Sequence, residues 1–215
     1  MTLQFNDEVV ALKEMLLTMG SRAEAMLAKS IEALVRRDEN LAREAIDEDE
    51  MLDELEKAVD EKAILLLAKA PLATDLRLIA AAMKISQNLE RVGDEATSIA
   101  RRAIDLNQEP QLKPYVDIPR MAAIALEMLK DALDAFVNRN TEKARAVVPR
   151  DKEVDQIHKQ LQRELVSYMI ESPATITRCL HLMTISKRIE RIADHATNIA
   201  EEVVYIYEAR DIRHT

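Results

Sequence analysis

The sequence predicts an all-α protein built as two tandem antiparallel three-helix bundles related by internal duplication. Its 215 residues include only 2 Gly and 6 Pro, with 48% hydrophobic and 32% charged residues, a composition typical of long amphipathic helices. Apolar residues recur at spacings of three and four, and no segment alternates with period two long enough to indicate a strand. The stretch LERVGDEATSIA at residues 89–100 recurs as IERIADHATNIA at residues 189–200, which indicates the duplication.

The first half contains three predicted helices, each with its apolar residues on one face. Gly20 lies inside the first of them and costs about 1 kcal/mol without ending it. Pro71 ends the second, because proline cannot continue a helix. The predicted helices cover about residues 6–37, 39–69 and 74–107.

The second half repeats this plan after a proline-containing linker at residues 108–117. Pro149 is a candidate interruption of its middle helix, and Pro173 marks the next turn. The predicted helices cover about residues 118–139, 141–171 and 174–209. With short connections, three long helices in each half favour antiparallel bundles. We therefore divide the chain into a first bundle at residues 1–109 and a second at residues 110–215.

Charge and cysteine content exclude several classes of function. The net charge of −9, without a basic stripe, argues against nucleic-acid binding, which needs clustered Lys and Arg. Cys179 is the single cysteine, so no disulfide framework or thiolate metal site is expected, and a reducing cytoplasm fits. The first residues do not resemble a signal peptide, and no apolar run approaches the ~18 residues of a membrane span. Contact with a membrane is expected only through partners.

Each copy of the repeat carries an acidic pair at positions i and i+4, namely Glu90 with Asp94 and Glu190 with Asp194. Like charges at this spacing repel by about 0.2–0.5 kcal/mol, so a helix that carries them twice in the same context needs a compensating feature. At ~100° per residue, Glu90 and Asp94 point away from the apolar stripe of their helix. We interpret the pairs as ligands of a cation on the outer face.

The middle helix of each half supplies a matching pair of aspartates. In the first half that pair lies 22 and 18 residues before the turn proline, and the pair in the repeat lies 23 and 19 residues after it. The second half gives 22 and 18 residues before its proline, and 21 and 17 after. With ~1.5 Å rise per residue, each set of four carboxylates is expected at one height over a shared groove. The predicted metal ligands are Asp49, Asp53, Glu90 and Asp94, and then Asp151, Asp155, Glu190 and Asp194.

Four carboxylates without thiolates form a hard oxygen site, which favours Fe(III), Mn, Mg or Ca and also accepts Zn. The small residues Ser86, Gly93 and Thr97 are expected to leave room for a cluster of several ions. Arg91 and Arg191 follow the two glutamates and are expected to pair with the ligating carboxylates. In the second half, Asn198 and Glu201 continue the same face, so that site could be richer in ligands.

No catalytic constellation is recognisable: there is no Ser-His-Asp arrangement, phosphate-cradling Gly-rich loop or His-Glu-x-x-His motif, and we expect no enzyme. His195 has Glu95 as its counterpart in the repeat, so it is not expected to be a shared ligand. Two other uses of the same residues stay open. One is a metal-storage or redox protein, and the other is a metal-free helical scaffold.

These residues resemble the PhoU family of phosphate-uptake regulators over nearly the whole chain. The resemblance is carried by ERVGD at residues 90–94, by ERIAD at 190–194 and by the aspartate pairs. It extends to TDLRLI at 74–79 and to DIRH at 211–214. It implies a cytoplasmic negative regulator of the phosphate-starvation response that links the ATPase PstB of the phosphate ABC transporter to the sensor histidine kinase PhoR. It also implies multinuclear iron or zinc clusters on the acidic motifs, and a homodimer.

The two copies of the motif differ at three positions. Residues Glu95, Ser98 and Arg101 of the first copy stand where the second has His195, Asn198 and Glu201. Equal metal content in the two halves is therefore not expected.

Overall fold

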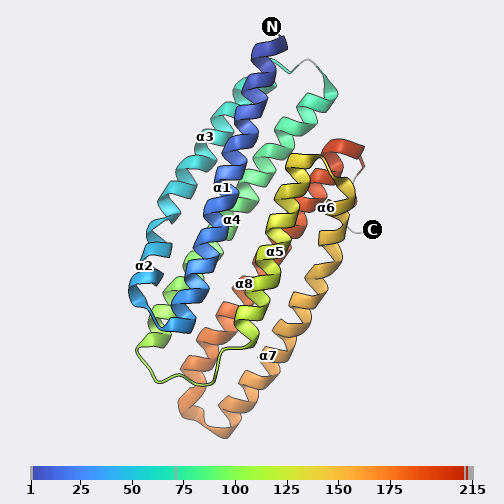
Figure 1. Ribbon diagram of the computed structural model, residues 1–215. Coiled ribbons are helices and arrows are strands. Elements are labelled where there is room, and N and C mark those ends of the chain that lie inside the picture. Colours follow the sequence, from blue (N-terminus) through green and yellow to red (C-terminus); the bar gives the residue numbers. More distant parts are fainter. Residues whose placement is uncertain (1, 71, 211, 213–215) are drawn as a thin grey trace.

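The computed structural model describes residues 2–70, 72–210 and 212, and every regular element in these ranges is a helix (Figure 1). The first half contains α1 (Thr2–Arg36), α2 (Glu39–Asp47), α3 (Asp49–Leu67) and α4 (Ala73–Asn107). The second half contains α5 (Asp117–Asn138), α6 (Thr141–Val147), the 3-10 turn η1 (Val148–Arg150), α7 (Asp151–Glu171), the 3-10 turn η2 (Pro173–Thr175) and α8 (Ile176–Glu208). The prediction of an all-α fold with two similar halves is confirmed.

Four long helices form the centre of the molecule. Helix α4 packs against α8 and α1, α8 packs against α5, and α1 packs against α5. Helix α3 covers one flank and α7 the other, as Figure 1 shows. One apolar core runs through both halves, with Leu16, Ile85, Phe136 and Ile189 all fully buried in it. Because the halves share this core, independent domains at 1–109 and 110–215 stay a prediction.

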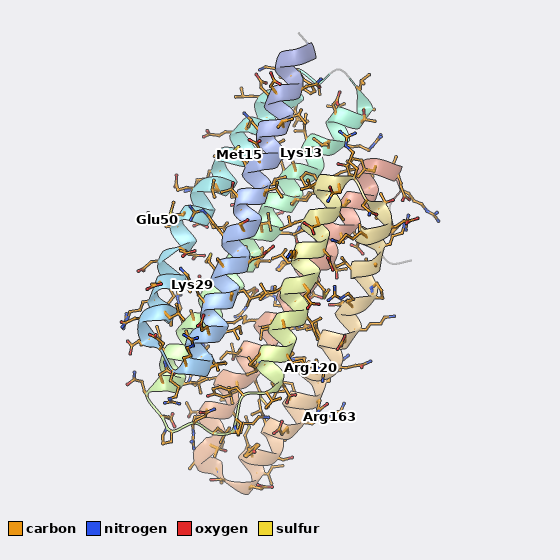
Figure 2. All side chains as sticks on the ribbon, in the orientation of Figure 1. Lys13, Met15, Lys29, Glu50, Arg120 and Arg163 are labelled. Carbon is orange, nitrogen blue, oxygen red and sulfur yellow. The ribbon has the colours of Figure 1, made fainter. Side chains whose placement is uncertain are left out.

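Gly20 allows a close approach of α1 to α5, one of the contacts between the halves. A Cβ atom on Gly20 would lie 2.4 Å from Cδ1 of Leu133, well inside contact distance. The lone glycine in α1 therefore serves helix packing, and α1 continues through it as predicted. Charged side chains such as Glu50, Arg120 and Arg163 project from the outside of the assembly (Figure 2).

In both halves the first helix is followed by a left-handed residue and then by a side chain that caps the next helix. Arg37 adopts a left-handed backbone with φ of 58°, and the carboxylate of Asp38 then accepts from the first backbone N–H groups of α2. In the second half Arg139 has φ of 55°, and Asn140 caps α6. Such caps satisfy donors that a helix start leaves unpaired, and they fix the turns predicted at these points.

The predicted helix at 39–69 is interrupted, because α2 ends at Asp47 and α3 begins at Asp49. The break matches the one at Pro149, which the sequence predicts and η1 confirms. Helices α3 and α7 therefore start on Asp49 and Asp151, where an acidic side chain is favoured by the helix dipole. The acidic run at residues 47–50 is the sequence signal for this start.

Some predicted features lie outside the described residues. They are Pro71 and most of the tail motif at 211–214. The segment at 108–116 between α4 and α5 is irregular, as expected for the segment predicted at 108–117, while its role as a domain boundary stays a prediction. Within the described ranges, each helix falls short of the apolar length that crossing a bilayer requires.

Two acidic grooves as candidate metal centres

The first acidic groove, which we define by Asp49, Asp53, Glu90 and Asp94, lies between α3 and α4. Burial raises the pKa of Asp49, and the charges of Asp94 and Asp53 raise it further. The pKa of Glu90 is raised to about 7, first by burial and then by the negative charge of Asp94. Carboxylates from both helices therefore lie close enough to repel one another, as their matched heights predict.

A further carboxylate belongs to this groove and is missing from the predicted set. The pKa of Glu56 is raised by burial first and then by the charges of Asp60 and Asp53, and Glu56 in turn raises the pKa of Glu90. Four of the acids of α3 follow one another at spacings of four, three and four residues and so share one helix face: Asp49, Asp53, Glu56 and Asp60. That continued spacing is the signal by which the sequence could have revealed Glu56.

The second acidic groove, defined by Asp151, Asp155, Glu190 and Asp194, lies between α7 and α8. Burial raises the pKa of Asp194 to about 6, and the charges of Glu190 and Asp151 add to it. The pKa of Asp151 is raised by burial, then by Asp155 and Glu190. Oδ1 of Asp151 is buried and has no hydrogen-bond partner among the described residues.

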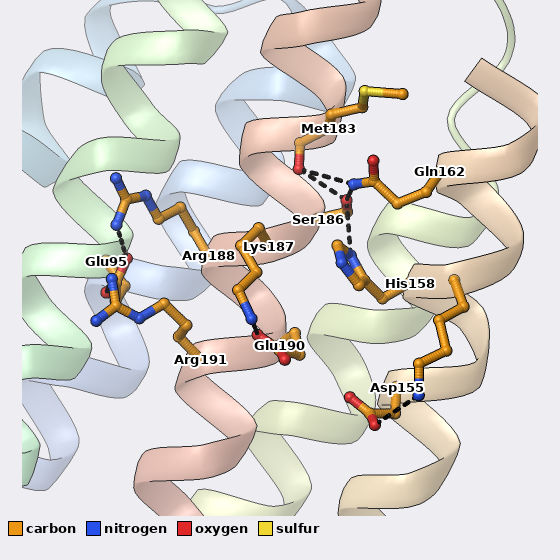
Figure 3. A network of polar contacts seen from close by, with 11 residues as sticks. Glu95, Asp155, His158, Gln162, Met183, Ser186, Lys187, Arg188, Glu190 and Arg191 are labelled. Carbon is orange, nitrogen blue, oxygen red and sulfur yellow. Dashed lines mark hydrogen bonds and ion pairs between the residues drawn. The ribbon is translucent and has the colours of Figure 1, made fainter. Parts of the chain in front are cut away.

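Lysine side chains make the second groove less negative than the first. Lys187 lies 2.5 Å from Glu190, as Figure 3 shows. Lys159 lies 3.1 Å from Asp155. In the first groove Arg91 lies 3.4 Å from both Glu90 and Asp94. The second groove is therefore closer to internal neutrality.

A histidine absent from the predicted set also belongs to the second groove. Nδ1 of His158 is 3.1 Å from Oγ of Ser186. Burial lowers the pKa of His158, and the charge of Glu190 opposes that shift. His158 occupies the position that Glu56 holds in the first half, 102 residues earlier, as Asp155 does for Asp53.

The donor set suits a hard cation, since oxygens surround both grooves and their carboxylates are held at unfavourable charge density. The buried Oδ1 of Asp151, which has no hydrogen-bond partner among the described residues, is likewise an oxygen donor suited to such a cation. In the part of the chain that the structure describes, however, no three His, Cys, Asp or Glu side chains converge tightly enough to hold an ion. Cation binding therefore requires side-chain rotation, and in the second groove it requires Lys187 and Lys159 to leave. The metal assignment stays a prediction.

The space expected beside the first groove is occupied. A Cβ on Gly93 would lie 2.4 Å from Cδ2 of Leu52, so the glycine admits a core leucine of α3. The hydroxyl of Ser86 is buried against Sδ of Met19. Thr97 is also buried, so these three small residues do not open a cavity for extra ions.

The expected pairing of the arginines holds only for Arg91. The sequence suggested that Arg191 pairs with the preceding residue, Glu190. Instead, Nη1 of Arg191 lies 3.1 Å from Oε1 of Glu95 on α4. Nη1 of Arg188 is 2.9 Å from the other oxygen of Glu95, whose side chain is only 6% exposed. Figure 3 shows both arginines reaching from α8 to this carboxylate. Asn198 also contacts α4, through Asn88 at 3.3 Å.

A neutral pair occupies the equivalent place in the duplicated structure. Nδ1 of His195 is 3.0 Å from Oδ1 of Asn88. His195 is the counterpart of Glu95, and Asn88 that of Arg188, each 100 residues apart. Burial, and then Arg191, lower the pKa of His195 to about 4, so it is neutral at physiological pH. The two halves thus meet through equivalent positions with different chemistry.

Comparison with known proteins gives one family. The PhoU domain model matches twice, at residues 16–103 and 118–203. Among curated relatives, the "Phosphate-specific transport system accessory protein PhoU homolog" of Pseudomonas putida is 40% identical over 213 residues, covering 98% of this chain and 83% of the relative. The protein of the same description from Rhizobium meliloti is 43% identical over 204 residues, covering 94% of this chain and 86% of the relative.

Solved structures agree. The crystal structure of PhoU from Pseudomonas aeruginosa has a TM-score of 0.93 at 38% identity, covering 96% of this chain and all of that one. The structure of the phosphate transport system regulatory protein PhoU from Streptococcus pneumoniae has a TM-score of 0.90 at 27% identity, covering 97% of this chain and 99% of that one.

Proposed function

Since this chain belongs to the PhoU family, we propose that it is an accessory protein of a phosphate-specific transport system and a regulator of phosphate uptake. The double family match and the shared fold of two PhoU structures support this role. The relatives carry names of accessory proteins, which favours a protein without catalysis of its own.

The two acidic grooves bind iron or zinc in this proposal. The observation that carries it is the assembly of eight carboxylates into two equivalent groups, in which burial first and then mutual repulsion raise the pKa to about 7 at Glu90 and to about 6 at Asp194. A bound cation would supply the positive charge that these groups lack. It would hold the carboxylates of α3 against those of α4, and those of α7 against those of α8.

The partner proposal extends this to signalling. A cytoplasmic homodimer would connect the transporter ATPase PstB with the sensor kinase PhoR and repress the starvation response while phosphate enters. The acidic charge of the chain, −9 in total, suits basic protein surfaces rather than nucleic acid. The family resemblance, and not the geometry of the grooves, supports these two partners.

A metal-free scaffold is the second candidate. It is favoured by the lysines that already pair with Asp155 and Glu190, and by the absence of a converged ion site among the described residues. A storage or redox role is less well supported. The grooves lie at the flanks of the molecule, between α3 and α4 and between α7 and α8, and not in the central core.

Metal content per chain tests the proposal most directly. Untagged protein, purified without chelators, is analysed by mass spectrometry beside the double variant Asp94→Ala/Asp194→Ala. The matched control is Glu54→Ala/Glu153→Ala, which removes two exposed carboxylates from the same hairpins. We expect bound iron or zinc in the wild type and control, and its loss in the groove variant. Equal metal in all three proteins would contradict binding in the grooves.

The regulatory role is tested with a reporter under phosphate-starvation control. Deleting the protein should activate the reporter in high phosphate, and the wild-type chain should restore repression. A reporter that stays silent after deletion excludes the role of repressor. Normal repression by Asp94→Ala/Asp194→Ala would favour the metal-free scaffold.

A further inference from the structure

A groove of about 480 Å³ lies along α8, within one helical turn of the second acidic groove. Three of its lining side chains are cationic, and we call it the basic groove. Figure 3 shows these three on α8, with Arg188 and Arg191 directed to α4 and Lys187 beside Glu190. The lining residues are Leu180, Met183, Thr184, Lys187, Arg188 and Arg191.

The second half carries more positive charge on this face than the first. A pocket of the first half shares three equivalent positions with the basic groove, Met83, Lys84 and Gln87. Its lining is completed by Glu56 and Asp60 of α3, so two carboxylates face one lysine there. Lys187 and Arg188 of the basic groove have the neutral Gln87 and Asn88 as counterparts 100 residues earlier. Arg191 corresponds to Arg91 and Thr184 to Lys84, so the second half carries three cations at positions where the first half carries two.

The two arginines are held in place before any ligand arrives. Glu95 is nearly buried, and each of its oxygens takes one Nη1 atom, from Arg188 at 2.9 Å and from Arg191 at 3.1 Å. The other guanidinium nitrogens make no hydrogen bond to the described residues. Ordering a long side chain beforehand lowers the entropy cost of binding. Paired guanidinium groups match the oxygens of a phosphate.

The cations of the basic groove have fewer carboxylates within ion-pair distance than their own number. Glu95 offsets one arginine and Glu190 offsets Lys187, so three cations face two carboxylates. Within ion-pair distance the difference is one positive charge, and it lies at the two arginines, which share the single carboxylate of Glu95. Lys187 is also acted on by Asp151 and Asp194 of the second acidic groove, so an anion is attracted mainly to the arginines.

Thr184 adds a feature that distinguishes anions. Its hydroxyl donates to the backbone oxygen of Leu180 at 2.8 Å, so the remaining capacity of Oγ1 is to accept. Inorganic phosphate carries at least one O–H donor at neutral pH, whereas sulfate carries none. A phosphate monoester, whose second pKa is about 6, keeps such a donor only in part, so the contact with Thr184 favours the free anion. The apolar side chains of Leu180 and Met183 complete the wall.

We propose that the basic groove binds a phosphate group on Arg188, Arg191 and Lys187, either as free inorganic phosphate or as a phosphate monoester on a small molecule. This goes beyond the proposed function, because it requires neither a metal nor the transporter. It would let the protein respond to a phosphate compound directly.

Isothermal titration calorimetry of the full chain in EDTA tests it, with inorganic phosphate, glycerol 3-phosphate and sulfate as separate titrants. We expect one phosphate per chain, with sulfate about fivefold weaker because it leaves Thr184 without a donor. Lys187→Gln and Arg191→Gln should each weaken phosphate binding by about 5- to 10-fold. The matched control is Lys159→Gln, which removes an equally charged, ion-paired lysine outside the groove and should leave the affinity within about twofold.

The two phosphate titrants identify the source: tighter binding of glycerol 3-phosphate indicates a monoester, and equal or tighter binding of inorganic phosphate indicates the free anion. No binding of either, equal binding of sulfate, or unchanged affinity in Lys187→Gln would each overturn the proposal. Lys187→Gln leaves Glu95 fully paired, so it decides the matter even where Arg191→Gln fails to fold. Phosphate binding that requires added metal and disappears in Asp194→Ala would place the anion on a metal and also overturn it. If the purified protein contains no metal but binds phosphate in EDTA, the metal proposal is contradicted and the phosphate proposal is supported.

Discussion

Glu90→Gln should stabilise the metal-free protein at alkaline pH, because it removes a charge that the first acidic groove disfavours. The pKa of Glu90 is raised from 4.5 to about 7, by burial first and then by Asp94. Between these two values the folded chain holds a proton on Glu90 that the unfolded chain has released. Its contribution therefore lowers the stability of the wild type as pH rises through this window, and the loss remains above pH 7.

The magnitude follows from the same shift. A carboxyl pKa raised from 4.5 to about 7 corresponds to ~3 kcal/mol in a site without solvent. The groove is open to water, and screening reduces this to ~1–2 kcal/mol. For a chain of this length each kcal/mol moves the melting temperature by about 2–4 °C. Glu90→Gln should therefore melt about 2–8 °C above the wild type at pH 8 and nearly equal to it at pH 4.5.

Thermal unfolding followed by circular dichroism in EDTA measures this difference across the pH range. Glu61→Gln is the control, since it neutralises an exposed carboxylate on the same helix as Asp53 and should change little. A variant that melts at or below the wild-type temperature at pH 8 would refute the reasoning. So would an increase of the same size at both ends of the pH range, because the cause would then not be the charge of Glu90.

Three other outcomes are expected. Glu95→Gln should lower the free energy of unfolding in urea by ~1–3 kcal/mol, because two arginines lose their charged partner; an unchanged midpoint would contradict this. Gly93→Ala should lower it by ~1–3 kcal/mol through the clash with Leu52, and truncating that leucine as well should leave no additional loss from the alanine. Lys187→Gln should strengthen zinc binding in equilibrium dialysis by about 3- to 10-fold, because the lysine competes for its carboxylate partner; weaker binding would exclude that competition.

The fold was predictable because both of its determinants are local in sequence. The apolar spacing defines the helices, and the repeat at 89–100 and 189–200 defines the two halves. The register of the acidic groups also followed, because antiparallel helices joined at one turn place residues at equal distances from that turn at the same height. The break before Asp49 was not predicted, since no proline marks it and the acidic run at 47–50 is a weaker signal of a helix start.

What the sequence missed depends on contacts between helices that are distant along the chain. Arg191 pairs with Glu95 and not with its neighbour Glu190, a choice that only the packing of α8 on α4 decides. The need for a glycine at position 93 also comes from a contact between helices, because the side chain of Leu52 fills the space where a Cβ atom would lie. Such pairings carry no periodic signal, and a pattern of residue types along one helix does not identify them.

The differing pairs at the contact of α4 with α8 show what joining two repeats in one polypeptide allows. In a homodimer of a single repeat, positions 95 and 195 would be the same residue, and every substitution would act twice. Here Glu95 and His195 differ, so one contact is an ion pair between Glu95 and arginines of α8 while its equivalent joins the neutral His195 and Asn88. The chain therefore has the freedom of a heterodimer, yet its two parts associate independently of protein concentration.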